Sequence, residues 1–197
     1  MRIVLATDAW EPQVNGVVRT LTRTIGECRG MGHEVEVIAP SQFKTIPCPT
    51  YPEIRLALGA EEEIRERLRA FEPEAVHIAT EGPIGIATRR ICVEWKLPFT
   101  TSYHTKFPEY VSARFPIPVQ VGYAYMKWFH KPSGRLMVAT PTLRDELTAH
   151  GFRNVSPWTR GVDTEQFLEN LKPYPEPEKA RFWRRIRRLA RLRKRAA

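Results

Sequence analysis

Short apolar runs rich in β-branched residues alternate along this chain with longer segments in which apolar residues recur at helical spacing. The runs with strand character are Arg2–Thr7, Glu34–Ala39, Glu53–Leu58, Ala75–Ala79, Phe99–Tyr103, Arg135–Ala139 and Val155–Trp158. The segments with helix character are Gly16–Gly30, Glu61–Phe71, Gly82–Trp95, Val119–Phe129 and Thr142–His150. This alternation predicts an α/β fold, a Rossmann-like parallel sheet with helices on both faces.

Proline marks the segments expected to be loops. Ser41–Tyr51 is rich in proline, and Pro108, Pro116 and Pro118 follow the strand Phe99–Tyr103. Beyond about Phe167 the alternation stops, and KPYPEPE has the composition of a linker. The predicted organisation is therefore a domain over residues 1–167, a linker over 168–180 and an Arg-rich tail over 181–197.

The charge of the chain is unevenly distributed. The formal net charge is +9, but residues 181–195 hold eight arginines and one lysine. Removing these nine from the 31 basic residues leaves 22, equal to the 22 acidic residues. The body is thus formally neutral, and no nucleic-acid partner is expected for it.

Three interpretations of the tail remain open. RFWRRIRRLARLRKR places Phe182, Ile186 and Leu189 at i, i+4 and i+7, typical of an amphipathic helix on an anionic membrane surface. The same composition could bind nucleic acid, although nothing else in the chain supports this. It could also be out-of-frame translation after a frameshift, because GC-rich codons then yield Arg and Ala.

Several classes of protein do not fit the sequence. The three cysteines, Cys28, Cys48 and Cys92, are odd in number and far apart, so neither a disulfide framework nor a zinc site is indicated. The N-terminus does not resemble a signal peptide, and no run of about 18 apolar residues suggests a transmembrane helix. A cytoplasmic location is expected, with a peripheral place at the inner membrane face if the tail binds lipid.

Candidate chemistry lies directly after the strands, because ligands of open α/β sheets bind beyond the carboxyl ends of strands. The first strand is followed by DAWEPQVNGVV, in which Gly16 and Val17 begin a helix. A helix N-terminus offers N–H groups and a positive dipole end to a phosphate, and glycine permits close approach. Asn15–Gly16 could equally be an ordinary turn before a core helix.

Two further positions follow strands. Glu81, with Gly82 beside it, comes after Ala75–Ala79, and such a carboxylate is either a ligand contact or a helix cap. His104 ends Phe99–Tyr103 and could donate to a sugar hydroxyl or change charge near neutral pH, unless it is a structural histidine. His33, His77, His130 and His150 lie in less favourable places.

Five segments in order carry a family resemblance: MRIVLATDAWEPQVNGVVRTL, ATEGPIG, TSYHTKFPEY, VATPTLRDEL and WTRGVDTEQF. Together they resemble the N-terminal domain of family 4 glycosyltransferases of GT-B architecture, in particular GDP-mannose-dependent α-mannosyltransferases and related glycolipid synthases. The resemblance covers residues 1 to about 167. It implies retaining transfer of a hexose from a nucleotide-diphosphate sugar, such as GDP-mannose, to a lipid or glycan acceptor, without a metal or other cofactor.

The resemblance also implies roles for individual residues. Gly16, in a loop shaped by Asn15, would approach the donor diphosphate or the acceptor, and His104 would act as the catalytic residue at the transferred sugar. The remaining donor- and acceptor-binding candidates are Val17, Glu81, Gly82, Tyr103, Thr105, Thr142 and Arg160. Bond cleavage places positive character on the sugar and negative charge on the diphosphate, and a helix N-terminus would stabilise the latter.

The chain departs from the family pattern at two positions. Asn is expected where Lys106 stands, and Gly where Thr159 stands; Lys106 could bind an anionic acceptor or simply be solvated. The family's second domain, which would supply the nucleotide pocket, is absent, so the chain alone is expected to be inactive. The alternatives are a non-catalytic acceptor- or membrane-binding module complemented by a C-terminal partner chain, and a nicotinamide-binding domain. The missing GxGxxG argues against the last.

Overall fold

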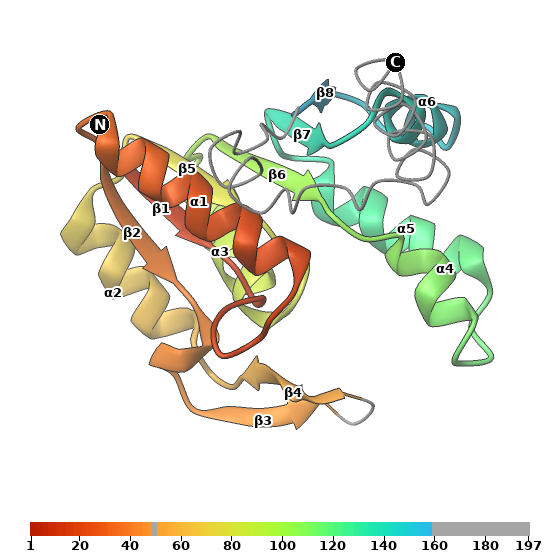
Figure 1. Cartoon of the computed structure of the whole chain (residues 1–197), viewed down its shortest axis with the longest axis horizontal. Coiled ribbons are helices and arrows are strands. Elements are labelled where there is room, and N and C mark those ends of the chain that lie inside the picture. Colours follow the sequence, from red (N-terminus) through yellow and green to blue (C-terminus); the bar gives the residue numbers. More distant parts are fainter. Residues whose placement is uncertain (49–50, 159–197) are drawn as a thin grey trace, which may run out of the picture. The chain divides into compact units, whose positions relative to one another are not determined.

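The predicted alternation of strands and helices is present in the computed structural model, which describes residues 1–48 and 51–158. Eight strands are found there: β1 (Arg2–Ala6), β2 (Glu34–Ile38), β3 (Thr45–Cys48), β4 (Tyr51–Ala57), β5 (Ala75–Ile78), β6 (Phe99–Tyr103), β7 (Arg135–Val138) and β8 (Val155–Pro157). The helices are α1 (Gly16–Gly30), α2 (Glu61–Phe71), α3 (Pro83–Glu94), α4 (Phe107–Ser112), α5 (Val119–His130) and α6 (Pro141–Ala149), with a 3₁₀ turn, η1, at Pro40–Gln42. The described part lies in one compact unit (Figure 1).

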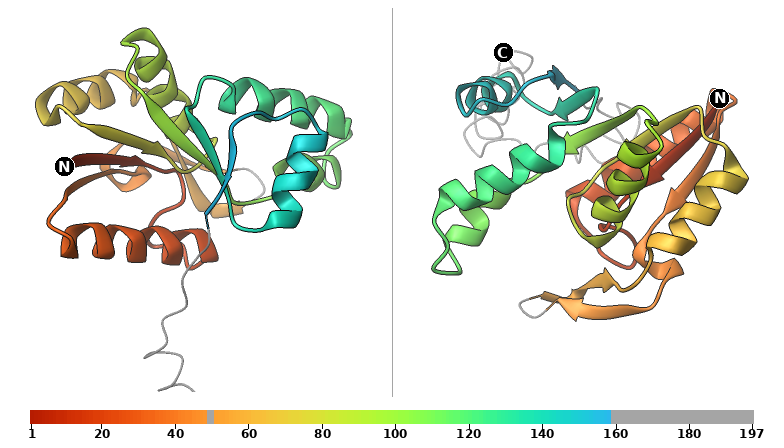
Figure 2. Two further views of the ribbon diagram at one scale, coloured as in Figure 1. Left: turned by 90° about the horizontal axis from the view of Figure 1, so that it is seen from above. Right: turned by 180° about the vertical axis from the view of Figure 1, so that it is seen from behind.

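Six strands form a parallel sheet in the order β2-β1-β5-β6-β7-β8. Helix α1 covers one face, while α2 and α3 cover the other (Figure 2). The Rossmann-like sheet with helices on both faces is thereby confirmed. All six strands run in one direction, so their carboxyl ends and the loops that follow lie along one edge, here called the carboxyl edge.

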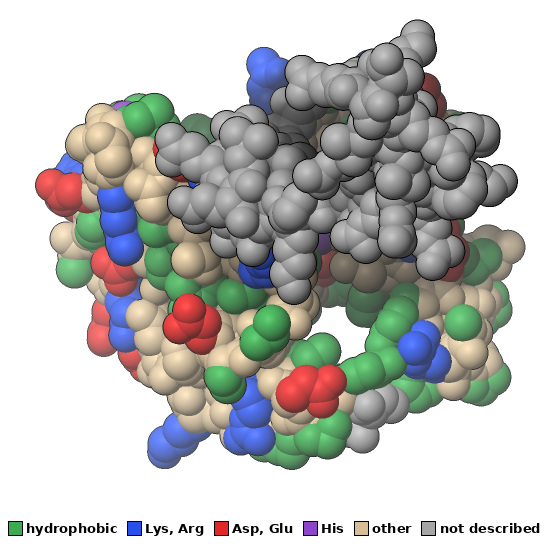
Figure 3. Space-filling view, viewed as in Figure 1, with side chains coloured by type: hydrophobic (Ala, Val, Ile, Leu, Met, Phe, Trp, Pro, Cys, Tyr) green, Lys and Arg blue, Asp and Glu red, His purple; other side chains and the backbone are tan. Residues whose placement is uncertain are grey.

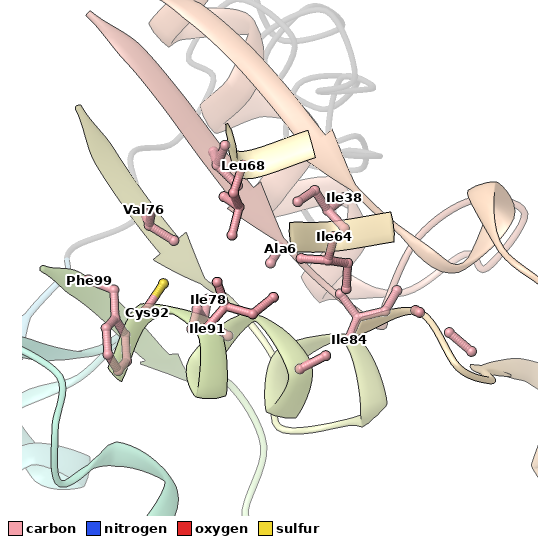
Figure 4. Packing of buried hydrophobic residues seen from close by; sticks show 14 of the residues in the cluster. Ala6, Ile38, Ile64, Leu68, Val76, Ile78, Ile84, Ile91, Cys92 and Phe99 are labelled. Carbon is pink, nitrogen blue, oxygen red and sulfur yellow. The ribbon is translucent and has the colours of Figure 1, made fainter. Parts of the chain in front are cut away.

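The core follows from alternation along the strands, whose successive side chains point to opposite faces. On one face, Val4 and Ala6 pack with Ile64 and Leu68 of α2 and Ile91 of α3 (Figure 4). On the other face, strand and helix side chains meet in a second cluster made of Leu5, Leu21, Ile25, Val35 and Ala79. A third cluster joins β6 and β7 to α5 and α6.

Two segments predicted as loops contain regular structure. Ser41–Tyr51 includes β3, which pairs antiparallel with β4 in a separate two-stranded sheet, so the predicted strand at Glu53–Leu58 lies outside the parallel sheet. Pro47 is tolerated because a two-stranded ribbon leaves an N–H position unused. The loop predicted after β6 includes α4, since Pro108 stands in its first turn, where the missing N–H costs nothing.

The predicted linker and tail, and the three interpretations of the tail, lie outside the described residues. Among the helices of the described part, none combines the length and the apolar character needed to cross a bilayer.

Candidate functional site

The loop after β1 is held to the start of α3 by the carboxylate of Asp8. Its oxygens accept from the backbone N–H groups of Ile84, at 2.9 Å, and Gly85, at 3.2 Å. Thr80 Oγ1 donates to the same carboxylate at 2.9 Å and accepts from the Asp8 N–H at 2.6 Å. Asp8 thus caps α3 although it lies more than 70 residues away in sequence, and its side chain points into the fold.

Burial raises the pKa of Asp8, and hydrogen bonds from Ile84, Thr80 and Gly85 oppose that shift. The carboxylate of Asp8 also explains why residue 82 is a glycine. A Cβ at Gly82 would lie 2.5 Å from Asp8 Cγ. The absence of a side chain at Gly82 is therefore required by Asp8 within the chain, whatever ligand the site binds.

Helix α1 begins at the same edge and is capped by its own N-cap residue. The Asn15 side-chain oxygen accepts from the N–H groups of Val17 and Val18, both at 3.0 Å. Asn15 and Gly16 are exposed, and a Cβ at Gly16 would meet nothing within 4 Å. Neither packing nor a positive φ in the described fold requires glycine at 16, so the structure leaves open space beside this residue. Two of the N–H groups that the sequence offered to a phosphate, those of Val17 and Val18, are however already engaged by Asn15.

His104 follows β6 on the face of the sheet that carries His77. The rings of His104 and Trp158 have centroids 5.9 Å apart, and those of His77 and Trp158 lie 5.7 Å apart. Both nitrogens of His77 lie 2.8 Å from hydroxyls of β6, those of Thr100 and Ser102. Burial, with a contribution from His104, lowers the pKa of His77 to about 4, so this ring is neutral at pH 7.

Tyr103 points to the opposite face from His104. It is 2% exposed, and its ring packs in the cluster with Met126 and Phe152. The ring cannot line an exposed acceptor surface, because the alternation of β6 turns it into the core. Burial first, and then the neighbouring carboxylate of Glu109, raises the pKa of its hydroxyl.

Glu81 is not the cap of α3, a task that Asp8 performs. Its carboxylate lies 3.4 Å from Nε2 of His130, and its side chain is 17% exposed. Tyr125 donates its hydroxyl to the Glu81 carbonyl. His130, which the sequence analysis counted among the less favourable histidines, thus lies beside this loop. Its position on the apolar side of the predicted helix is the sequence signal that could have identified it.

The remaining predicted residues are spread along the edge. Thr105 is exposed after β6, and Thr142 is exposed in the first turn of α6. Lys106 forms an ion pair with Glu146, at 2.6 Å, which raises the pKa of the lysine, so the anionic-acceptor interpretation would require this pair to open. Arg160 and Thr159 lie outside the described residues.

The fold resembles part of the UDP-GlcNAc 2-epimerase of Methanocaldococcus jannaschii, which matches 93% of this chain and 53% of its own, with a TM-score of 0.55 and 14% identity. The sequence profile of Glycosyltransferase Family 4 matches residues 14–166. The chain belongs to this family.

Two kinds of relative are found in the family. A GDP-mannose-dependent α-mannosyltransferase of Mycobacterium tuberculosis is 25% identical over 87% of this chain and 50% of its own length. An α-monoglucosyldiacylglycerol synthase of Streptococcus pneumoniae is 26% identical over 56% of this chain and 28% of its own. The chain spans about half the length of the mannosyltransferase relatives it matches. Among the described residues, no group of three acidic, His or Cys side chains is placed to hold a metal ion.

Proposed function

We propose that residues 1–167 form the acceptor-side half of a retaining glycosyltransferase. It moves a hexose, with mannose as the first candidate, from a nucleotide-diphosphate sugar to a lipid or glycan acceptor. The supporting observation is that Gly16 and His104, far apart in sequence, both lie on the carboxyl edge of a chain matched by the family over 14–166.

In this proposal the residues of the carboxyl edge have different roles. His104 contacts the transferred sugar, where positive character develops, and the open space beside Gly16 admits the donor or acceptor. Glu81 and Thr105 lie where acceptor hydroxyls would be bound. Because half the donor contacts come from a second domain, the 197-residue polypeptide by itself transfers no sugar.

The test joins this chain to the C-terminal domain of a family member and screens nucleotide sugars, beginning with GDP-mannose. The joined protein should turn over a donor, while the 197-residue chain alone should not. His104→Ala in the joined protein should lower kcat by at least tenfold with an unchanged thermal midpoint. Turnover by the chain alone, or full activity of His104→Ala, would contradict the assignment.

A second arrangement is a non-catalytic module completed by a separate partner chain. It shares with the first proposal the observation that the chain spans about half of each mannosyltransferase relative. In that case the 197-residue chain should gain activity when a separately produced C-terminal domain is added in solution. Activity that appears only on covalent joining speaks against this arrangement.

A further inference from the structure

The arm formed by α4 and α5 exposes an unusual share of apolar side chains. Five of the eleven exposed large hydrophobic residues in the described part of the chain fall within residues 107–128. They are Phe107, Phe115, Ile117, Val121 and Trp128. In Figure 3, apolar side chains reach the surface beside this arm. A cluster of this kind on one arm marks a surface that contacts something apolar.

The apolar residues form a continuous stripe along α5. Val121, Tyr125 and Trp128 are spaced at i, i+4 and i+7, so they share one side of the helix. Tyr125 contacts both aromatic neighbours, with ring centroids 5.8 Å from Trp128 and 6.0 Å from Phe107 of α4. The core-facing side of α5 is distinct and carries other residues, Gly122, Tyr123, Met126, Phe129 and His130.

The stripe is held in place by the packing of α4 against α5 and by Arg89. A Cβ at Gly122 would lie 2.7 Å from Pro108 Cα, so α4 and α5 pack backbone against backbone. Arg89 of α3 donates to the carbonyls of Trp128 and Phe129, and its guanidinium lies 4.0 Å from the centroid of the Trp128 ring. The exposed aromatic groups are therefore fixed in place.

The charged residues around the stripe indicate which kind of partner it binds. Between Glu109 and Asp145 the sequence has no acidic residue, and its basic residues there are Arg114, Lys127, Lys131, Arg135 and Arg144. Lys127 precedes Trp128 on α5, and Lys131 is the C-cap residue three positions after Trp128; both are exposed, and neither forms an ion pair with a described residue. Tyr and Trp beside unpaired lysines is the composition that suits the interface of an anionic bilayer. A soluble glycan would use the aromatic rings without the surrounding positive charge.

The stripe also leads to the candidate site, since the Tyr125 hydroxyl donates to the carbonyl of Glu81 on the carboxyl edge. We propose that Phe107, Val121, Tyr125 and Trp128, flanked by Lys127 and Lys131, form a docking surface for an anionic lipid bilayer. The docking surface would bring a lipid acceptor to the edge that carries Glu81 and His104. This purpose rests on the proposed function.

Vesicle flotation of the full 197-residue chain tests the docking surface. The double variant Val121→Gln/Trp128→Gln should bind vesicles of phosphatidylcholine and phosphatidylglycerol at least tenfold more weakly than the unchanged chain. The control Met31→Gln/Val93→Gln removes two hydrophobic residues exposed elsewhere and should bind as the unchanged chain does. Vesicles of phosphatidylcholine alone should bind weakly. Equal binding by the double variant would overturn the proposal and assign any lipid binding to residues 181–195.

A second measurement does not depend on the folding of the double variant. Lipids brominated in the acyl chain quench the emission of a tryptophan that enters the bilayer. Quenching should fall in Trp128→Phe and be unchanged in Trp95→Phe, whose ring lies at the end of α3 between Arg65 and Arg69. Identical quenching in the two variants would overturn the docking surface. No donor is present in either experiment, so failure of the proposed transfer reaction would leave these results unaffected.

Discussion

At the scale of single residues, Asp8 is the side chain that connects two loops of the carboxyl edge. It stands 7% exposed and satisfies two N–H groups of α3 that the N-cap residue, Gly82, cannot. A carboxylate in this position also complements the positive end of the helix dipole. One side chain thus fixes the loop that leads to Asn15 and Gly16 relative to the loop that carries Glu81.

Asp8→Ala should lower the free energy of unfolding by about 2–4 kcal/mol, because it leaves buried N–H groups of Ile84 and Gly85 without their acceptor. Asp145→Ala is the control, since that carboxylate is 67% exposed, and it should change stability by less than about 0.5 kcal/mol. Urea unfolding followed by circular dichroism measures both. Equal stabilities for the two variants would show that the α3 cap contributes little.

His77 should make the stability of the fold depend on pH. Its pKa is lowered from 6.5 to about 4, so the folded state binds the proton less tightly than the unfolded chain. The contribution is complete above about pH 6.5 and is lost as pH falls toward 4, amounting to up to roughly 3 kcal/mol. His77→Gln, whose amide can still bond Ser102, should lack this component. The check is the difference between the two pH profiles of urea unfolding; parallel profiles would contradict it.

At the scale of elements, the β3–β4 hairpin contacts α4 through Tyr51 and through Arg114, which follows the end of that helix. The Arg114 guanidinium lies 3.7 Å from the centroid of the Tyr110 ring, and its Nε donates to the Tyr51 hydroxyl at 3.0 Å. The two tyrosine rings are themselves 5.8 Å apart. Since the hairpin is a two-stranded sheet of its own, this contact ties it to the α4–α5 arm.

Arg114→Ala should therefore free the hairpin without unfolding the sheet. Limited proteolysis between residues 45 and 57 should accelerate several-fold, while the thermal midpoint changes by no more than a few degrees. Arg144→Ala provides the control, because that arginine bonds only its neighbour Asp145 among the described side chains. Unchanged cleavage in Arg114→Ala would show that other contacts hold the hairpin.

The elements also show what the sequence could and could not predict. The bounds of α2 and β6 follow from periodicity, because each has a clean apolar pattern and a clear stop. The hairpin was missed since Pro47 and the polar residues near it lack an alternating pattern, and α4 was missed since Pro108 reads equally as a loop residue. The Asp8 cap could not be predicted at all, because its partners are more than 70 positions away.

At the scale of the whole molecule, the proposed division of labour predicts how chimeric proteins behave. Residues 1–167 joined to the C-terminal domain of a mannosyltransferase or of a glucosyl-lipid synthase should differ in the donor they use and agree in the acceptor. The reason is that the acceptor-side groups, Glu81 and Thr105, are common to both. Product analysis with a fixed acceptor panel measures this. An acceptor preference that follows the C-terminal domain would contradict it.

The capped helices have a consequence for ligand discovery. Asn15 already fills the N–H groups at the start of α1, and Asp8 does so for α3. N–H groups at both helix starts, which would ordinarily attract a phosphate, are thus already hydrogen-bonded within the chain, and Asp8 adds a carboxylate at the start of α3. A fragment screen on this polypeptide should therefore yield few nucleotides and phosphates. Under the proposed acceptor-side role, uncharged hydroxyl-rich compounds and amphiphiles should be found more often.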